Sequence, residues 1–263
     1  MRFVMLQKLL SPLVALLLLL SANLACTRFF RRQAPQDKGG LLLVIAVKAD
    51  SAQLEQSIAR TIAVIERRCD QLAVYCKLER QGSDQIELRI SGGMEPERIK
   101  SVLLSEGLEM RPVVSKPSPY PLESYSTQAE AATAAGTDKD VTLYNQDGKK
   151  SFVVVERTPI VTGEDVSRAT AVPVSNNYQV AFNLKSEGAA RLRAWTGANI
   201  NKYIAIILNK EARTVASIKS EIGDSGVITG RFTKQEAEDI AHVLMTGNLP
   251  APVEMVKEGT YKP

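Results

Sequence analysis

The stretch LLLVIAVKADSAQLEQSIARTIAVIERRCDQLAVYCKLERQGSDQIELRI (residues 41–90) decides the fold, because it places a strand, a helix and two strands in direct succession. Its first nine residues, 41–49, predict a buried strand, because 41–47 are a continuous apolar run of strand length. A helix is expected to start at Asp50 or Ser51, with one apolar side formed by Leu54, Ile58, Ile62, Ile65, Cys69 and Leu72. Residues 73–81 and 85–90 then predict two strands joined by a Gly-Ser-Asp turn.

Two further elements complete this pattern. Residues 95–105 predict a second helix that presents Ile99, Val102 and Leu103, and LEMRPVV (108–114) predicts a fourth strand. The order β-α-β-β-α-β is the split βαβ pattern of a ferredoxin-like sandwich. We therefore expect a four-stranded antiparallel sheet with two helices on one face and its other face free.

The composition changes after this first region. Residues 116–126 are rich in Pro and Ser, residues 126–136 favour a short helix, and residues 138–150 are polar with an Asp-Gly turn. We interpret 115–150 as a linker or a loosely packed insertion. A second region then returns to alternating patterns, with strands expected at 151–157, 178–184, 202–209, 213–218, 226–230 and 252–258, and helices at 186–200 and 233–246. The fold class is mixed α+β.

The last helix carries clear signals at both ends. Thr233 and Glu236 have the spacing of a capping box, in which each side chain accepts a hydrogen bond from a free backbone N–H of the first turn. Gly247 is a natural left-handed terminator, and Pro250 and Pro252 prevent continuation. Its apolar face is expected to hold Ala237, Ile240, Ala241, Leu244 and Met245.

The composition favours an ordinary core and a balanced surface. Apolar residues make up 44% of the 263 residues, and 33 Lys and Arg oppose 29 Asp and Glu. This balance argues against nucleic acid as a partner. The single histidine, His242, is expected to be structural, and Trp195 to lie in a core or at an interface. We find no phosphate loop, metal-ligand spacing or nucleophile signature, and therefore expect no enzyme activity, metal or cofactor.

The first residues predict export. A short basic start and an apolar run precede SANLAC, which indicates a lipoprotein-type signal peptide over 1–25 with lipidation at Cys26. An uncleaved membrane anchor and ordinary cleavage are the alternatives. The first two readings place the folded part outside the cytoplasm, tethered to a membrane by residues 26–38. Cys69 and Cys76 are expected to be two small buried free thiols. The alternative, which an oxidising compartment would allow, is a disulfide between them.

Several segments, in this order and spacing, resemble the SecD family. The resemblance runs through SEGAARLRAWTGANI, YIAIILNKEARTVASI, SGVITGRFT, EAEDIAHVL and MTGNLPAPVEMVKE, all between residues 186 and 258. VVVERTPIVTGEDVSRA lies just upstream of them. Earlier segments, from GGLLLVIAV through ERQGSDQIELRI to ISGGMEPERIKSVLLSEGLEMRPVV, are similar to the family's amino-terminal subdomain.

The resemblance implies the two subdomains of the family's first periplasmic domain. A ferredoxin-like base would use residues 39–114 plus 249–263, and an inserted α+β head would use 115–248. Thr233, Glu236, Gly247, Pro250 and Pro252 would brace the head and carry the chain back to the base. The sequence ends at Pro263, before the family's membrane helices would follow, so we expect a polypeptide-handling module on a tether.

The resemblance also implies partners. These would be exported polypeptides and the Sec translocon, met on the outer face of a membrane. The alternative function is a structural or scaffolding envelope lipoprotein that reuses the fold to bind another envelope protein.

Overall fold

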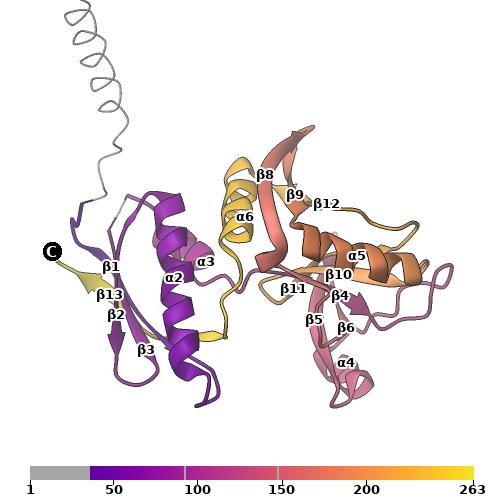
Figure 1. Cartoon of the computed structure of the whole chain (residues 1–263), viewed down its shortest axis with the longest axis horizontal. Coiled ribbons are helices and arrows are strands. Elements are labelled where there is room, and N and C mark those ends of the chain that lie inside the picture. Colours follow the sequence, from indigo (N-terminus) through magenta and orange to yellow (C-terminus); the bar gives the residue numbers. More distant parts are fainter. Residues whose placement is uncertain (1–35, 92, 147) are drawn as a thin grey trace, which may run out of the picture. The chain divides into compact units, whose positions relative to one another are not determined.

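A computed structural model describes residues 36–91, 93–146 and 148–263 (Figure 1). The signal peptide predicted over 1–25, the lipidation site predicted at Cys26 and most of the tether predicted over 26–38 lie outside the described residues. Within the described residues, no helix has the length and apolar character needed to cross a membrane.

The first sheet has four antiparallel strands in the order β13-β1-β3-β2. These strands are β1 (Gly40–Val47), β2 (Tyr75–Gln81), β3 (Gln85–Ser91) and β13 (Val253–Tyr261). Helices α2 (Leu54–Leu72) and α3 (Pro96–Leu103) cover one face of this sheet. Their apolar faces and the sheet share one core, which includes Leu43, Ile45, Ile65, Leu88 and Leu103.

The strand at 108–114 does not join this sheet, so its predicted place was wrong. Strand β4 (Leu108–Val113) instead pairs along its whole length with β10 (Tyr203–Leu208), and β13 is the fourth strand of the first sheet. The redirection begins at Gly107, whose φ of 99° is one that side chains rarely adopt. Leu108 and Met110 are consequently buried in a separate core.

The second sheet closes into a small barrel. Its order is β10-β11-β5-β6-β4-β7, and the β10–β4 pairing closes the ring of β10, β11, β5, β6 and β4, while β7 adds to β4. The remaining strands are β5 (Lys139–Gln146), β6 (Lys149–Glu156), β7 (Val161–Thr162) and β11 (Glu211–Ser217). Apolar side chains such as Val153, Ala205 and Ile207 fill its interior.

The predicted linker at 115–150 is therefore wrong over much of its length. Residues 139–146 form β5. The short helix predicted at 126–136 is present as α4 (Gln128–Ala135), which starts at a capping box of Thr127 and Glu130. Ala131 and Ala135 bury this helix against Val154 of β6. The polar composition was misleading because one side of each barrel strand faces solvent.

The third sheet has three antiparallel strands in the order β12-β9-β8. They are β8 (Val166–Val174), β9 (Asn177–Leu184) and β12 (Ser225–Phe232). Helices α5 (Ser186–Ala198) and α6 (Lys234–Thr246) and the short 3-10 turn η1 (Gly163–Asp165) pack beside it. Strand β8 had no counterpart among the strands expected from the sequence.

Candidate functional site

A single buried arginine, Arg68, joins the two chain crossings that link the first sheet to the rest of the fold. The first crossing follows α3 and the second follows α6. The Arg68 guanidinium is 0% exposed and donates to the carbonyl oxygens of Val102, Leu103 and Ser105 at 3.2, 2.8 and 2.7 Å. It also donates to Thr246 Oγ1 at 3.2 Å and to the Gly247 carbonyl at 2.8 Å.

The acceptors explain how a cation is kept in this core without a facing carboxylate. The carbonyls belong to the ends of α3 and α6, and the carboxyl end of a helix carries a partial negative charge that favours a cation. Burial, together with the charge of Arg67, lowers the pKa of Arg68 to about 9, so it remains protonated at neutral pH. A buried charge is tolerated only when its donors are satisfied, and here the two crossings satisfy them.

Asn248 fixes the second crossing to the barrel. Its side chain pairs with Leu108 as a strand would, accepting from Leu108 N at 3.0 Å and donating to Leu108 O at 3.0 Å. The same Oδ1 accepts from Gly163 N at 3.1 Å. A Cβ on either Gly107 or Gly163 would collide with Asn248 Oδ1, which explains why both positions are glycine.

The first crossing is held by the β10–β11 hairpin. Asn209 and Lys210 occupy its tip with φ of 54° and 63°, the positive values of a tight two-residue turn. Asn209 Oδ1 accepts from Ser105 Oγ at 2.5 Å and from Glu106 N at 3.1 Å. Side-chain hydrogen bonds therefore hold the first crossing to the β10–β11 hairpin and the second crossing to β4.

Ion pairs connect α2 and α3 to the elements beyond the crossings. Arg98 of α3 binds Asp239 of α6 through two hydrogen bonds of 2.8 Å, with both side chains mostly buried. Arg60 of α2 lies 2.7 Å from Glu164 in η1, where both side chains are exposed. The bidentate, shielded pair is the stronger of the two, since exposed pairs are screened by water.

Helix α6 contacts both sides of the junction. Ala237, Ala241 and Leu244 are buried in the core shared with the third sheet, whereas Val243 is buried in the core of the first sheet. Met245, expected on the apolar face, is 42% exposed. Helical periodicity predicts one apolar face, whereas α6 has two buried faces that pack in different cores.

The predicted start of α6 is present, whereas its end has a different geometry from the one predicted. Thr233 Oγ1 accepts from Glu236 N, and the Glu236 carboxylate accepts from Thr233 N. Gly247 ends the helix with a φ of 82° and an extended ψ of 176°, which differs from the left-handed geometry expected. Beyond it, Ala251 is buried in the core of the first sheet, and the Pro252 carbonyl accepts from Lys48 N.

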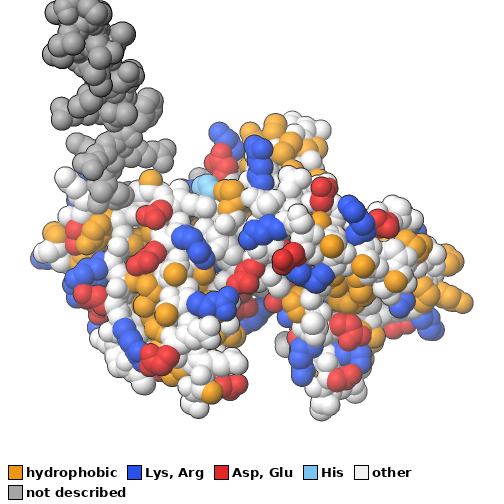
Figure 2. Space-filling view, viewed as in Figure 1, with side chains coloured by type: hydrophobic (Ala, Val, Ile, Leu, Met, Phe, Trp, Pro, Cys, Tyr) orange, Lys and Arg blue, Asp and Glu red, His pale blue; other side chains and the backbone are white. Residues whose placement is uncertain are grey.

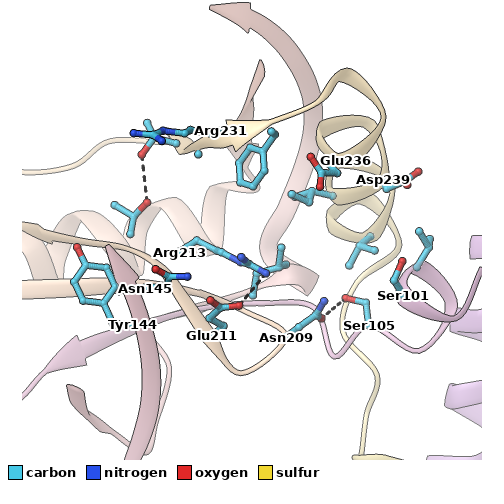
Figure 3. A pocket seen from close by; sticks show the side chains of 18 of the residues that line it. Ser101, Ser105, Tyr144, Asn145, Asn209, Glu211, Arg213, Arg231, Glu236 and Asp239 are labelled. Carbon is cyan, nitrogen blue, oxygen red and sulfur yellow. Dashed lines mark hydrogen bonds and ion pairs between the residues drawn. The ribbon is translucent and has the colours of Figure 1, made fainter. Parts of the chain in front are cut away.

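A cleft of about 860 Å³ opens beside the junction (Figure 3). Its walls come from α3, α6, β11, β12 and the end of the β5–β6 hairpin. Arg213 and Glu211 form an ion pair of 3.1 Å within it, and half-buried Phe232 and Ile240 supply apolar surface. Its lining therefore combines charged groups of both signs with apolar side chains.

The other residues singled out in the sequence lie apart from this cleft. Cys69 and Cys76 form a disulfide across a Cα–Cα distance of 6.1 Å, so the reading as two free thiols was wrong. Trp195 is half-buried against the core of the third sheet. The Nδ1 atom of half-buried His242 is buried, without a hydrogen-bond partner in the described part of the chain. Residues 36–263, apart from 92 and 147, contain no cluster of three metal-ligating side chains.

Arg68 was missed, although the sequence holds a signal for it. It follows Ile65 by three residues and precedes Leu72 by four, so helical periodicity places it on the buried face of α2. A lone cation on such a face needs acceptors from elsewhere in the fold.

Comparison with known proteins relates the chain to the SecD family. The family model for "SecDF, P1 head subdomain" matches residues 140–251. The protein translocase subunit SecD of Aquifex aeolicus is 33% identical over 233 residues, which cover 87% of this chain and 44% of the relative. SecD of Koribacter versatilis is also 33% identical, over 219 residues covering 80% of this chain and 40% of the relative. The chain thus spans less than half the length of these relatives.

Solved structures agree with the sequence matches. A crystal structure of SecDF in a super-membrane-facing form has a TM-score of 0.64 and 25% identity, covering 95% of this chain and 35% of that one. A second structure, of a membrane component SecDF that enhances protein export, has a TM-score of 0.61 over 82% of this chain and 98% of that one, at 24% identity. The second likeness shows the fold alone.

The relatives are subunits of a protein translocase, and the matched family model describes one subdomain of such a subunit. More specifically, it is a homologue of the periplasmic P1 domain of SecD and SecDF.

Proposed function

We propose that this protein is a membrane-tethered, extracytoplasmic module that handles exported polypeptides next to the Sec translocon. The observation that carries the proposal is the 33% identity to a SecD subunit over 87% of the chain, because it includes both the first sheet and the elements beyond the crossings. On the face shown in Figure 2, Lys and Arg are interspersed with Asp and Glu, which suits polypeptides of varied sequence better than nucleic acid.

The proposal includes a division into two subdomains. The strand order β13-β1-β3-β2, with α2 and α3 on one face, supports a ferredoxin-like base closed by β13. The head would begin at β4 rather than after it, and would end with Asn248. Gly247, Pro250 and Pro252 would then form the return crossing.

The extracytoplasmic location and the tether are part of the proposal. The Cys69–Cys76 disulfide suits an oxidising compartment such as a periplasm. Anchoring would come from the signal region over 1–25, with lipidation at Cys26. Incorporation of labelled palmitate into the full chain tests the lipid, with the Cys26→Ser variant as control. A wild-type chain that takes up no label would contradict lipidation.

Crosslinking of the full chain in intact cells tests the function. A photoreactive group at exposed Arg213, in the cleft, should capture translocon subunits and nascent exported proteins. The same group at exposed Arg193, on α5 and outside the cleft lining, is the matched control and should capture much less. Capture of one folded envelope protein, without translocon subunits or nascent exported proteins, would contradict the export role. It would favour the alternative function as a scaffolding protein.

A further inference from the structure

Resting on the proposed function, we propose that an extended polypeptide segment binds in the 860 Å³ cleft by pairing, as an added strand, with the open edge of β11. The occupant is an unfolded chain recognised mainly through its backbone.

The strand pairing of β11 is one-sided. On one edge it pairs with β10 from Glu211 to Ser217. On its other edge, β5 pairs with it only at Glu211 and Ala212. Residues 213–217 therefore have no paired strand on that edge within the described part of the chain. Unpaired N–H and C=O groups on a strand edge are a template for another extended segment.

Strand β12 also leaves its ladder at this cleft. Ile228 pairs with Val180, but the next registered pair is Phe232 with Tyr178, so three residues oppose one. The bulged residues 229–231 line the same cleft, and Thr229 Oγ1 lies 3.4 Å from Thr214 Oγ1 of β11. Bulges end strand pairing locally, so the bulge does not occupy the edge of β11 as a regular strand would.

The dimensions and chemistry of the cleft fit an extended segment. Three of the unpaired residues of β11, 213–215, line the cleft and span about 10 Å at a strand rise of about 3.4 Å per residue. Half-buried Val215, Phe232 and Ile240 offer apolar contacts for alternate side chains of the added strand. Arg213 pairs with Glu211, and Arg231 and Glu236 also line the cleft (Figure 3). Such a mixed lining favours recognition through the backbone over recognition of one sequence.

The edge of the first sheet formed by β13 is less suitable. Strand β13 has one open edge, but it carries Glu254, Lys257 and Glu258, and Lys48 and Lys100 bind two of these acids. Charged side chains along an edge strand are a common protection against pairing. The edge of β11 beyond Ala212 has a single charged residue, Arg213.

N-methylated peptides test backbone pairing without changing the protein. The probe is a fluorescent ten-residue peptide of alternating Val and Thr, titrated against the full chain and followed by fluorescence anisotropy. N-methylation of alternate residues removes the donors of one edge, and methylation of the intervening residues removes those of the other. Because an added strand pairs through one edge, we expect one methylated peptide to bind at least tenfold more weakly than the other. Equal binding of both would overturn the proposal.

A crosslink across the cleft supplies the second test. Thr214→Cys with Thr229→Cys should form a disulfide that closes the space between β11 and β12. Oxidised, this variant should bind the unmethylated peptide at least tenfold more weakly than wild type, and reductant should restore binding. Wild type with and without reductant controls for the Cys69–Cys76 bond. Undiminished binding by the oxidised variant would overturn the proposed site and leave polypeptide handling intact. If wild type binds neither this peptide nor an unfolded envelope protein, both proposals fail.

Discussion

At the scale of single residues, the junction depends on polar groups that act across long sequence separations. Arg68 binds acceptors 34 to 179 residues further along the chain. Asn248 similarly joins the segment after α6 to Leu108, 140 residues earlier. Each side chain forms hydrogen bonds with backbone groups that the ends of helices and strands would otherwise leave unpaired.

Arg68→Met should strongly destabilise the protein. The change keeps much of the volume but leaves five acceptors without their donor, and unsatisfied buried groups cost about 1–3 kcal/mol each when water cannot reach them. We expect a loss of about 3 kcal/mol or more in the free energy of urea unfolding. Arg67→Met is the matched control, because exposed Arg67 makes a single bond to the Thr246 carbonyl. Equal losses in the two variants would contradict the role given to Arg68.

Gly163→Ala should be destabilising because its new Cβ would collide with Asn248 Oδ1. The φ of Gly163 is not in the positive range, so steric overlap is the main cost, typically about 1–3 kcal/mol. Adding Asn248→Ala should recover part of this loss, which a double-mutant cycle in urea unfolding measures. In the corresponding cycle with Gly107→Ala, adding Asn248→Ala should recover less of the lost stability, because the backbone strain at the φ of 99° remains. Strict additivity at Gly163 would show that Asn248 is not the obstacle.

At the scale of elements, local signals predicted what local contacts determine. The buried strand β1, the apolar face of α2 and the capping box of α6 all follow from neighbouring residues, and each is present. The pairing partner of β4 could not be predicted from neighbouring residues. Residues 108–114 and 252–258 both predict a strand, and the tertiary fold alone determines which of these two strands lies beside β1. The cleft beside β11 was beyond prediction for the same reason.

The disulfide shows how a small backbone feature changes a prediction. A spacing of seven residues between the cysteines left the pairing open. Ala73 ends α2 in the left-handed conformation with a φ of 55°, and its N–H and that of Val74 bond back to the last turn. This tight reversal brings β2 beside the end of α2, so Cys76 can reach Cys69.

Thr233→Ala should destabilise the protein by about 1 kcal/mol through the lost cap of α6. Thr233→Ser keeps the hydroxyl and should stay close to wild type. Thermal or urea unfolding of the three proteins measures the difference. An unchanged unfolding curve for Thr233→Ala would show that the cap contributes nothing to stability.

Removing the disulfide should cost about 2 kcal/mol, the value expected for a short loop closed by residues seven apart. The variant Cys69→Ala with Cys76→Ala should unfold at lower urea concentration than oxidised wild type. Reductant should lower the midpoint of wild type and leave that of the variant unchanged. A response of both proteins to reductant, or of neither, would contradict this account.

At the scale of the whole described chain, shielded ion pairs should limit movement between the first sheet and the elements beyond the crossings. Arg98→Glu places two like charges where a bidentate pair now lies, with side-chain exposures of 26% and 14%. We expect a broader distance distribution between spin labels on β2 and β8, measured by pulsed electron resonance. Adding Asp239→Arg should restore the narrow distribution, whereas Arg60→Glu at the exposed pair with Glu164 should change it less. If the distance distribution is unchanged in Arg98→Glu, the ion pair does not limit this movement, and Arg68 and Asn248 alone would do so.

The convergence of both crossings has an evolutionary consequence. Since Leu108 and Asn248 are hydrogen-bonded neighbours, the 139 residues between them leave and re-enter at almost one point. A segment attached in this way resembles a cassette, which recombination could exchange between chains without rearranging the sheet that carries it. A shortened variant in which a Gly-Ser turn replaces residues 108–248, combined with Arg68→Leu, should therefore still fold with β13 paired to β1. Failure of this shortened variant to fold would contradict modular exchange.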